Sequence, residues 1–364
     1  MSFYQDNNPN RQKLIRRSFA ESAALESDKP PVLDTKPKLN AALQDALRVE
    51  HFTIPPYLCA LYSIKEGTND KAVDIIKTVV MEEMLHLIMV ANLMNALGMK
   101  PEITGKSLIA RYPEPIPNGA PDFIVSLLKF SKESINTFLR IEKPAKEGAK
   151  PETANFHSIG QFYEAIRESL IWLDGKGKND NEPLFVGKPE KQVRAEDYYG
   201  GGGKLITVSN LKEAEAVLNE IVGQGEGIDG TINVDMKKGD ELAHYFRFNQ
   251  IFYERNYKPG DNARNPPTGT PMKVDWDSVY NMEPNPKMEK YSEYPWLLEK
   301  VKAFNITYNR LLDSIHNTCN HDRELLRKEG IPLMYQLKLQ AVELMKIPSG
   351  NGNYTAGPSF EYVS

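Results

Sequence analysis

The chain has 364 residues, of which 40% are hydrophobic and 26% are charged, and these are ordinary values for a globular protein. Its formal net charge of -4 gives no electrostatic reason to expect nucleic acid or an anionic membrane as a partner. No apolar run is long enough to span a membrane, the N-terminus carries no secretory signal, and two cysteines are too few for a disulfide framework. We therefore expect a soluble cytoplasmic protein.

The first predicted helix follows a polar segment, residues 1–38, which has no sustained period and is interpreted as an N-terminal arm. Over residues 39–64, apolar side chains recur at alternating steps of three and four, which predicts an amphipathic helix. Glu50 lies on this apolar stripe, where a hydrophobic residue is expected. Pro55 and Pro56 remove hydrogen bonds inside the helix. They predict a kink, which would either open the helix beside Glu50 or be tolerated for packing.

A second helix is predicted over residues 70–98. Glu83 and His86 form a Glu-x-x-His pair on its apolar stripe or at its edge, so both side chains point the same way and can share one metal ion. An ionised glutamate on a buried face is costly without a partner. Neighbouring Glu82 is expected about 100° around the helix, at a position that water can reach.

The remaining elements are also predicted to be helical, and strand signals are few and short. The fold class expected is all-α, a four-helix bundle over residues 39–258 with insertions, and a C-terminal loop and helical extension over 259–364 packed on it. Long loops are expected over 174–209 and 257–293. The further helices are predicted at 121–143, 157–173, 210–223, 240–256, 295–317 and 331–346.

The glutamate and histidine pattern of the first two helices occurs again later in the chain. Glu241 and His244 form a second Glu-x-x-His pair, and Glu226 precedes them, following Leu218 and Val222 at intervals of four. A loop of about 14 residues would place the two helices side by side. Glu142 also falls on a stripe, so it is an alternative to Glu226 as the third-helix ligand, or a seventh ligand. His51 is placed at the edge of the bundle.

The chemistry of these side chains explains why they occur together. Carboxylate oxygens and neutral imidazoles suit iron and manganese, and carboxylates can bridge two ions. A Glu, then Glu-x-x-His, repeated twice, is the arrangement of carboxylate-bridged di-iron and di-manganese bundles. The sequence therefore predicts a centre of two iron ions, with manganese possible. Its candidate metal ligands are Glu50, Glu83, His86, Glu142, Glu226, Glu241 and His244.

Several segments carry a resemblance to a known family. VEHFTIPPYLCALYSI, EEMLHLIMVANLMNALG, QGEG and ELAHYFRF, with PTGTPMKVDWDSVYNMEPNP and AGPSFEYV further on, resemble the ferritin-like domain of the iminophenyl-pyruvate dimer synthase family. These enzymes oxidatively join two indolic imines in violacein- and rebeccamycin-type biosynthesis. The resemblance covers residues from about 40 to 364. It implies a ferritin-like fold, with metal ligands at the six glutamate and histidine positions of the repeated pattern. The enzymes of that family carry a large additional region, so their substrate and product are not carried over.

The function expected is that of a di-iron or di-manganese oxidase or oxygenase using O2 or peroxide. Its substrate would be a small organic molecule, amino-acid-derived or aromatic, and a homodimer is the oligomer expected. Two alternatives belong to other classes. One is a ferroxidase or iron-handling protein, and the other is a ferritin-like scaffold that binds partners without metal.

Overall fold

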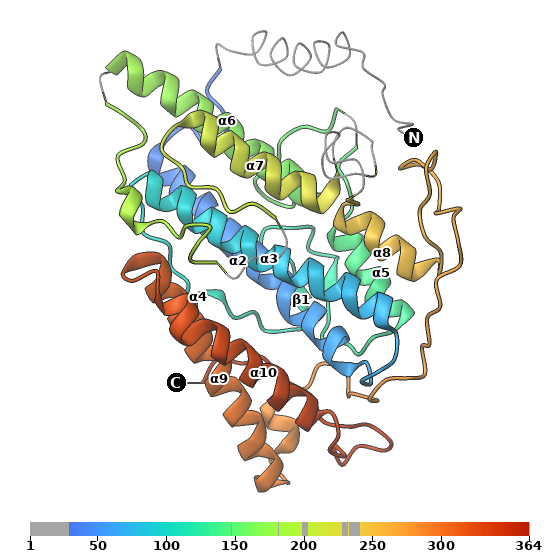
Figure 1. The fold of residues 1–364 in the computed structure, drawn as a ribbon. Coiled ribbons are helices and arrows are strands. Elements are labelled where there is room, and N and C mark those ends of the chain that lie inside the picture. The colour runs from blue at the N-terminus through green and yellow to red at the C-terminus, as the bar shows by residue number, and fades with distance from the viewer. Residues whose placement is uncertain are drawn as a thin grey trace.

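The computed structural model describes residues 29–146, 148–180, 182–198, 203–227, 232 and 241–363. The described part is mostly helical, with two strands of two residues each, which confirms the all-α expectation (Figure 1). Residues 1–28, most of the predicted arm, lie outside the described residues. The arm's last residues already belong to the first described helix, α2, which begins at Lys36.

Helices α2 (Lys36–Ser63) and α3 (Asp70–Ala96) form the central pair, and they run side by side in opposite directions (Figure 1). Despite Pro55 and Pro56, α2 continues without interruption to Ser63. Proline 56 leaves the carbonyl of Phe52 without its helical donor. The hydroxyl of Tyr112 donates to that carbonyl at 2.5 Å, so a side chain from the connection between α3 and β1 (Glu114–Pro115) replaces the missing backbone bond.

The other half of the bundle consists of four shorter helices instead of two long ones. Helix α6 (Ile159–Asp180) packs on α7 (Leu211–Glu226), and α5 (Lys132–Ile141) packs on α8 (His244–Phe252). Both α5 and α6 also contact α2, while α7 and α8 both contact α3. The half of the bundle that faces α2 and α3 is therefore interrupted between the α6–α7 pair and the α5–α8 pair. This interruption lies opposite the middle of α2 and α3.

The predicted helix over 121–143 is wrong in its first half. Residues 124–125 form strand β2 (Ile124–Val125), which pairs antiparallel with β1 (Glu114–Pro115). Helix α5 begins only after Ser131, whose side chain accepts from the N–H of Ser134 as an N-cap. The capping serine determines where this helix starts, and the spacing of apolar residues gives no indication of it.

The C-terminal residues form a helical hairpin beside the bundle. Helix α9 (Pro295–Asn320) leads through one turn of π-helix, η3 (Leu326–Gly330), into α10 (Ile331–Leu344). The hairpin contacts α2 and α3 on the side away from α6 and α7 (Figure 1). Three short elements lie in the connections: α4 (Gly105–Leu108), η1 (Pro189–Lys191) and η2 (Met288–Tyr291). No helix in the described ranges is long and apolar enough to cross a membrane.

His51 lies inside this interface, so its predicted place at the bundle edge is wrong. The ring is buried, and its Nε2 shares a hydrogen bond with the hydroxyl of Tyr308 from α9. Burial lowers the pKa of His51 to about 4, which keeps the imidazole neutral at neutral pH. One neutral hydrogen bond thus ties the C-terminal hairpin to α2, next to Glu50.

We expect Tyr308→Phe to destabilise the protein by about 1–3 kcal/mol, because it leaves a buried ring nitrogen of His51 without a partner. Urea unfolding monitored by circular dichroism measures the change. Tyr335→Phe is the matched control, because Tyr335 is 70% exposed on α10 and its substitution should change the unfolding free energy little. Equal stability of the two variants would contradict the role given to the His51–Tyr308 contact.

Candidate metal centre

Five of the seven candidate ligands converge in the interior of the bundle. Glu50 comes from α2, and Glu83 and His86 come from α3. Glu142 is the residue that caps the C-terminal end of α5, and His244 is the first residue of α8. They form two triads whose donor atoms lie within 4.8 Å of one another: Glu50, Glu83 and His86, and Glu83, Glu142 and His244. Glu83 belongs to both triads, so its carboxylate is common to the two candidate metal sites.

Both imidazoles turn the same ring nitrogen towards the carboxylates. His86 Nδ1 lies 3.4 Å from Glu50 Oε2 and 3.7 Å from Glu83 Oε1. His244 Nδ1 lies 2.9 Å from the same Glu83 oxygen and 3.4 Å from Glu142 Oε2. The two rings stack with centroids 5.7 Å apart. Each triad therefore offers one ring nitrogen and the oxygens of two carboxylates.

Each of the three carboxylates also accepts a hydrogen bond from a hydroxyl outside the cluster. Thr53, one turn after Glu50, donates to Glu83 Oε2 at 2.8 Å. Two buried tyrosines donate to the carboxylates that belong to only one triad. Tyr163 donates to Glu50, and Tyr57 donates to Glu142. Each carboxylate thus has one oxygen engaged by a hydroxyl, while the other faces an Nδ1 atom.

The Nε2 atoms of the two imidazoles also have hydrogen-bond partners. His86 Nε2 lies 2.7 Å from the side-chain oxygen of Gln224 on α7. His244 Nε2 lies 2.7 Å from Glu82 Oε2, which also accepts from Arg247 Nη1 at 2.7 Å. An acceptor at Nε2 places the ring proton there, which leaves the Nδ1 lone pair for a metal.

The sequence predicted that water could reach the side chain of Glu82, and this prediction is wrong. Its side chain is fully buried, because α8 covers the side of α3 that a simple hairpin would expose. Burial alone would raise the pKa of Glu82, but His244 and Arg247 outweigh it and hold the pKa below its ordinary value. Glu82 is thus an ionised partner of His244.

The electrostatics of the cluster itself favour protonation. Burial and the neighbouring Glu142 raise the pKa of Glu83 to about 7. Burial disfavours the charged form of His244, but the charges of Glu142, Glu82 and Glu83 outweigh it and raise the pKa of this imidazole well above its ordinary value. Burial also opposes the charged form of His86, yet Glu50 raises its pKa. Protons therefore occupy a site whose negatively charged carboxylates would also attract metal cations.

The residues present fit a metal. Among the described residues, the buried His244 Nδ1 has no hydrogen-bond partner, although oxygens of Glu83 and Glu142 lie close to it. A buried donor or acceptor of this kind is costly unless something else satisfies it. A cation between the ring nitrogen and the two carboxylates would satisfy all three groups. Hard oxygens with imidazole nitrogens form a donor set suited to iron or manganese.

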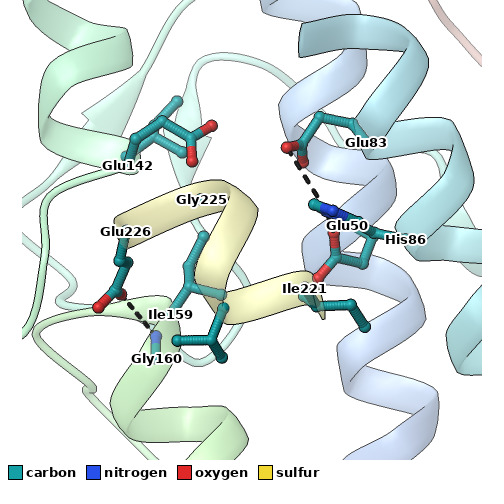
Figure 2. A pocket seen from close by; sticks show the side chains of 11 residues that line it. Glu50, Glu83, His86, Glu142, Ile159, Gly160, Ile221, Gly225 and Glu226 are labelled. Atoms are coloured by element: carbon teal, nitrogen blue, oxygen red, sulfur yellow. Dashed lines mark hydrogen bonds and ion pairs between the residues drawn. The ribbon is translucent and has the colours of Figure 1, made fainter. Parts of the chain in front are cut away.

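A small cavity adjoins the cluster, with a volume of ≈ 20 Å³, which is room for about one water molecule (Figure 2). Glu50, Glu83 and His86 line it from α2 and α3, and Glu142 lines it from the end of α5, across the cavity from them. Its opposite wall comes from the ends of α5, α6 and α7, where the aliphatic side chains and two glycines make a largely apolar surface. These wall residues are Ile141, Ile159, Gly160, Ile221, Val222 and Gly225.

The remaining two candidates lie outside the triads. Glu226, the last residue of α7, lines the same cavity, but its carboxylate accepts from the N–H groups of Gly160 at 2.7 Å and Ala145 at 2.8 Å. Glu241 lies ahead of α8 and its side chain is 42% exposed, 3.6 Å from Arg247. The predicted helix over 240–256 begins only at His244, so the second Glu-x-x-His pair does not share a helical face in this structure.

The partners of the ligands are the part of the site that the sequence pattern missed. Thr53 and Tyr57 follow Glu50 by three and seven residues, which is a helical spacing on one face and the signal that could have identified them. Tyr163 and Gln224 come from α6 and α7 and reach the cluster only through the tertiary fold.

Comparisons with known proteins agree with this architecture. The model of the ferritin-like family matches residues 43–253. Dichlorochromopyrrolate synthase from Lentzea aerocolonigenes is 25% identical over 317 residues, covering 77% of this chain but only 29% of that protein. A crystal structure of a ferritin-like protein from Caulobacter vibrioides, at 1.95 Å resolution, superposes with a TM-score of 0.61 over 92% of this chain and 100% of that one. Its 22% identity makes it evidence for the fold alone.

We expect Tyr163→Phe to weaken metal binding about 10–100-fold, because the hydroxyl that orients Glu50 is lost. Tyr112→Phe is the matched control, since Tyr112 is equally buried but donates to the Phe52 carbonyl. Anaerobic titration with Fe(II), followed by calorimetry, gives both dissociation constants. Similar losses in the two variants would show that packing, and not the contact with Glu50, is responsible.

The stability of the metal-free protein should fall as the pH rises from about 5 to about 8. The folded state keeps protons on Glu83, His86 and His244 at pH values where the unfolded chain has released them, because all three pKa values are raised. Below this window, protonation of Glu82, whose pKa is lowered, destabilises the fold. Thermal unfolding after chelation tests the trend.

The metal-loaded protein is the control for this experiment. Metal ligands bind in their deprotonated forms, so metal binding strengthens with pH and should remove or reverse the decline. Stability of the chelated protein that rises across the same window would contradict the protonation assigned to the cluster.

Proposed function

This chain belongs to the ferritin-like family, and on that basis we propose that it is a two-metal oxidase or oxygenase that acts with O2 or peroxide on a small organic substrate. The ions would be iron, with manganese as the alternative. The observation that carries the proposal is the pair of triads sharing Glu83, each completed by a histidine Nδ1 whose Nε2 is held by an acceptor.

The protein's own groups would do three things for such a centre. Glu50, Glu83 and Glu142 supply negative charge in the buried interior, and their hydroxyl partners fix the orientation of the three carboxylates. His86 and His244 present neutral nitrogens when their Nδ1 atoms are unprotonated. Bound iron or manganese supplies the redox chemistry with O2. The aliphatic wall excludes bulk water from the same space.

The substrate class rests on the relatives and on the cavity. Dichlorochromopyrrolate synthase is by its name a biosynthetic enzyme, and the similarity supports an amino-acid-derived or aromatic substrate for this chain. The cavity of ≈ 20 Å³ has room for a molecule the size of water or O2 beside the carboxylates. An organic substrate needs more space, so its binding must displace side chains of the wall formed by α5, α6 and α7.

Elemental analysis of protein purified without chelator is the test of the centre. We expect about two iron or manganese ions per chain in the wild type, as in carboxylate-bridged bundles. His86→Ala and His244→Ala should each lose bound metal, because each removes a nitrogen from one triad. His157→Ala is the control, since His157 is exposed and pairs only with Glu152 among the described residues. Wild-type protein that binds no added Fe(II) would overturn the proposal.

A second measurement separates an oxidase from an iron-storing protein. When O2 is added to protein loaded anaerobically with excess Fe(II), an oxidase of this kind should retain about two ions per chain. Continued uptake with a growing ferric mineral would assign the centre to iron handling instead. The absorbance of ferric iron, together with iron analysis after gel filtration, distinguishes the two results.

A further inference from the structure

Helix α10 has two apolar faces, although packing within the chain uses only one of them. The inner face is buried, and it consists of Leu333, Leu337, Ala341 and Leu344. Among the 14 residues of the helix, the polar ones are Gln336, Lys338, Gln340 and Glu343. A helix that is apolar all round is normally buried on all sides, so the second apolar face needs an explanation.

The second face consists of Pro332, Tyr335, Leu339 and Val342, which we call the outer stripe. Since each residue advances an α-helix by about 100°, these four lie on the side opposite Leu337. Tyr335 and Leu339 are 70% and 71% exposed, and among the described residues no large hydrophobic side chain is more exposed. Pro332 is also exposed, and Val342 is half-buried.

We propose that the outer stripe is the contact surface of a homodimer, in which α10 packs antiparallel against α10 of a second copy of this chain. Figure 1 shows α9 and α10 at one edge of the molecule, away from α6 and α7. A second copy can therefore reach α10 while the cavity wall formed by the ends of α5, α6 and α7 stays uncovered. The inference does not depend on the proposed two-metal centre.

The spacing of the outer stripe indicates that its partner is a helix. Its four members follow one another at steps of three, four and three residues. This is the a/d spacing at which side chains of one helix fit between those of another. A single exposed apolar residue is common on a protein surface. Four in one seam, on a helix whose other face already packs within the chain, indicate contact with another molecule.

The symmetry of the outer stripe favours another α10 as that helix. Tyr335 and Leu339 lie two residues before and after Leu337, and Pro332 and Val342 lie five residues before and after it. About a two-fold axis at Leu337, Tyr335 would pack against Leu339 of the second copy, and Pro332 against Val342. Every apolar side chain then meets an apolar side chain, which is the self-complementarity that a two-fold interface requires.

The charges of α10 are compatible with this pairing. The helix carries one charge of each sign, Lys338 and Glu343, and both lie beside the outer stripe. In the same register, Lys338 would lie opposite Gln336 of the second copy and Glu343 opposite Ile331, so no two like charges meet. Glu343 is already paired with Lys300 of α9 at 2.6 Å. The stripe itself is uncharged, as is usual at the centre of an interface.

The test is the molar mass of the full chain, measured by analytical ultracentrifugation at about 1 to about 200 μM protein. We expect the wild type to reach about 82 kDa, twice the 41.2 kDa of one chain. Leu339→Lys should stay at 41.2 kDa, because it places an unpaired charge in an apolar contact. Ile171→Lys is the matched control, since Ile171 is 42% exposed on α6, outside the hairpin, and its substitution should leave the dimer intact.

A pair of opposite charges tests the antiparallel register. Tyr335→Glu alone should give a monomer for the same reason as Leu339→Lys. When both changes are made in one chain, each glutamate faces the lysine of the second copy, and two ion pairs form across the interface. We expect the double variant to dimerise about tenfold more tightly than either single variant. Circular dichroism confirms that each variant is folded.

Three results would overturn the inference. Wild-type protein that stays monomeric over this range would leave the outer stripe to another occupant, such as the first 28 residues of the chain or a different protein. A dimer that persists in Leu339→Lys would place the interface elsewhere, and a double variant no tighter than the single ones would contradict the antiparallel pairing. The monomeric variants should keep the metal content of the wild type, so failure to bind metal would concern the proposed function alone.

Discussion

The structure depends on one constraint: three carboxylates and two imidazoles are buried together inside the bundle. Ionised groups in such a place are costly unless each is paired or neutralised. Each of the three carboxylates accepts from a hydroxyl, and each imidazole has an acceptor at Nε2. These contacts compensate part of the cost. The remainder appears as the raised pKa values of Glu83 and His244, which a bound cation would reverse.

The same constraint relates to the way the bundle is divided. Helices α2 and α3 are continuous and place Glu50, Glu83 and His86 by helical spacing alone. The opposite pair is interrupted at the site, so Glu142 and His244 come from helix ends. A continuous helix offers about one inward residue per turn, whereas a helix end can also bring backbone N–H groups to the cavity. Gly160, in the first turn of α6, does so here, and its N–H holds Glu226 together with that of Ala145 in the segment after α5.

The sequence predicted the half of the site that depends on local spacing. Glu50, Glu83 and His86 are polar residues on apolar stripes of uninterrupted helices, and they converge as the hairpin geometry predicts. The second Glu-x-x-His pair has the same letters, but Glu241 precedes the first turn of α8, so the helical argument does not apply to it.

Tertiary contacts decided the rest of the site. Glu82 is buried because α8 covers it, and the choice between Glu142 and Glu226 depends on where the ends of α5, α6 and α7 meet. The apolar periodicity of a helix contains no information about contacts between the ends of different helices. The apolar pattern likewise extended the third helix back to residue 121, whereas the serine cap at 131 starts it ten residues later.

The arrangement also restricts how a substrate reaches the centre. The hairpin of α9 and α10 covers α2 and α3 on one side of the molecule. The hydrogen bond between His51 and Tyr308 is buried in this interface. The cavity lies on the other side, behind the ends of α5, α6 and α7, and its wall combines aliphatic side chains with two glycines. Glu226 joins the parts of this wall, since its carboxylate accepts from the N–H groups of Gly160 in α6 and of Ala145 in the segment after α5. An organic substrate that reached the ligands from this side would therefore have to displace the Glu226 carboxylate or the aliphatic side chains beside it.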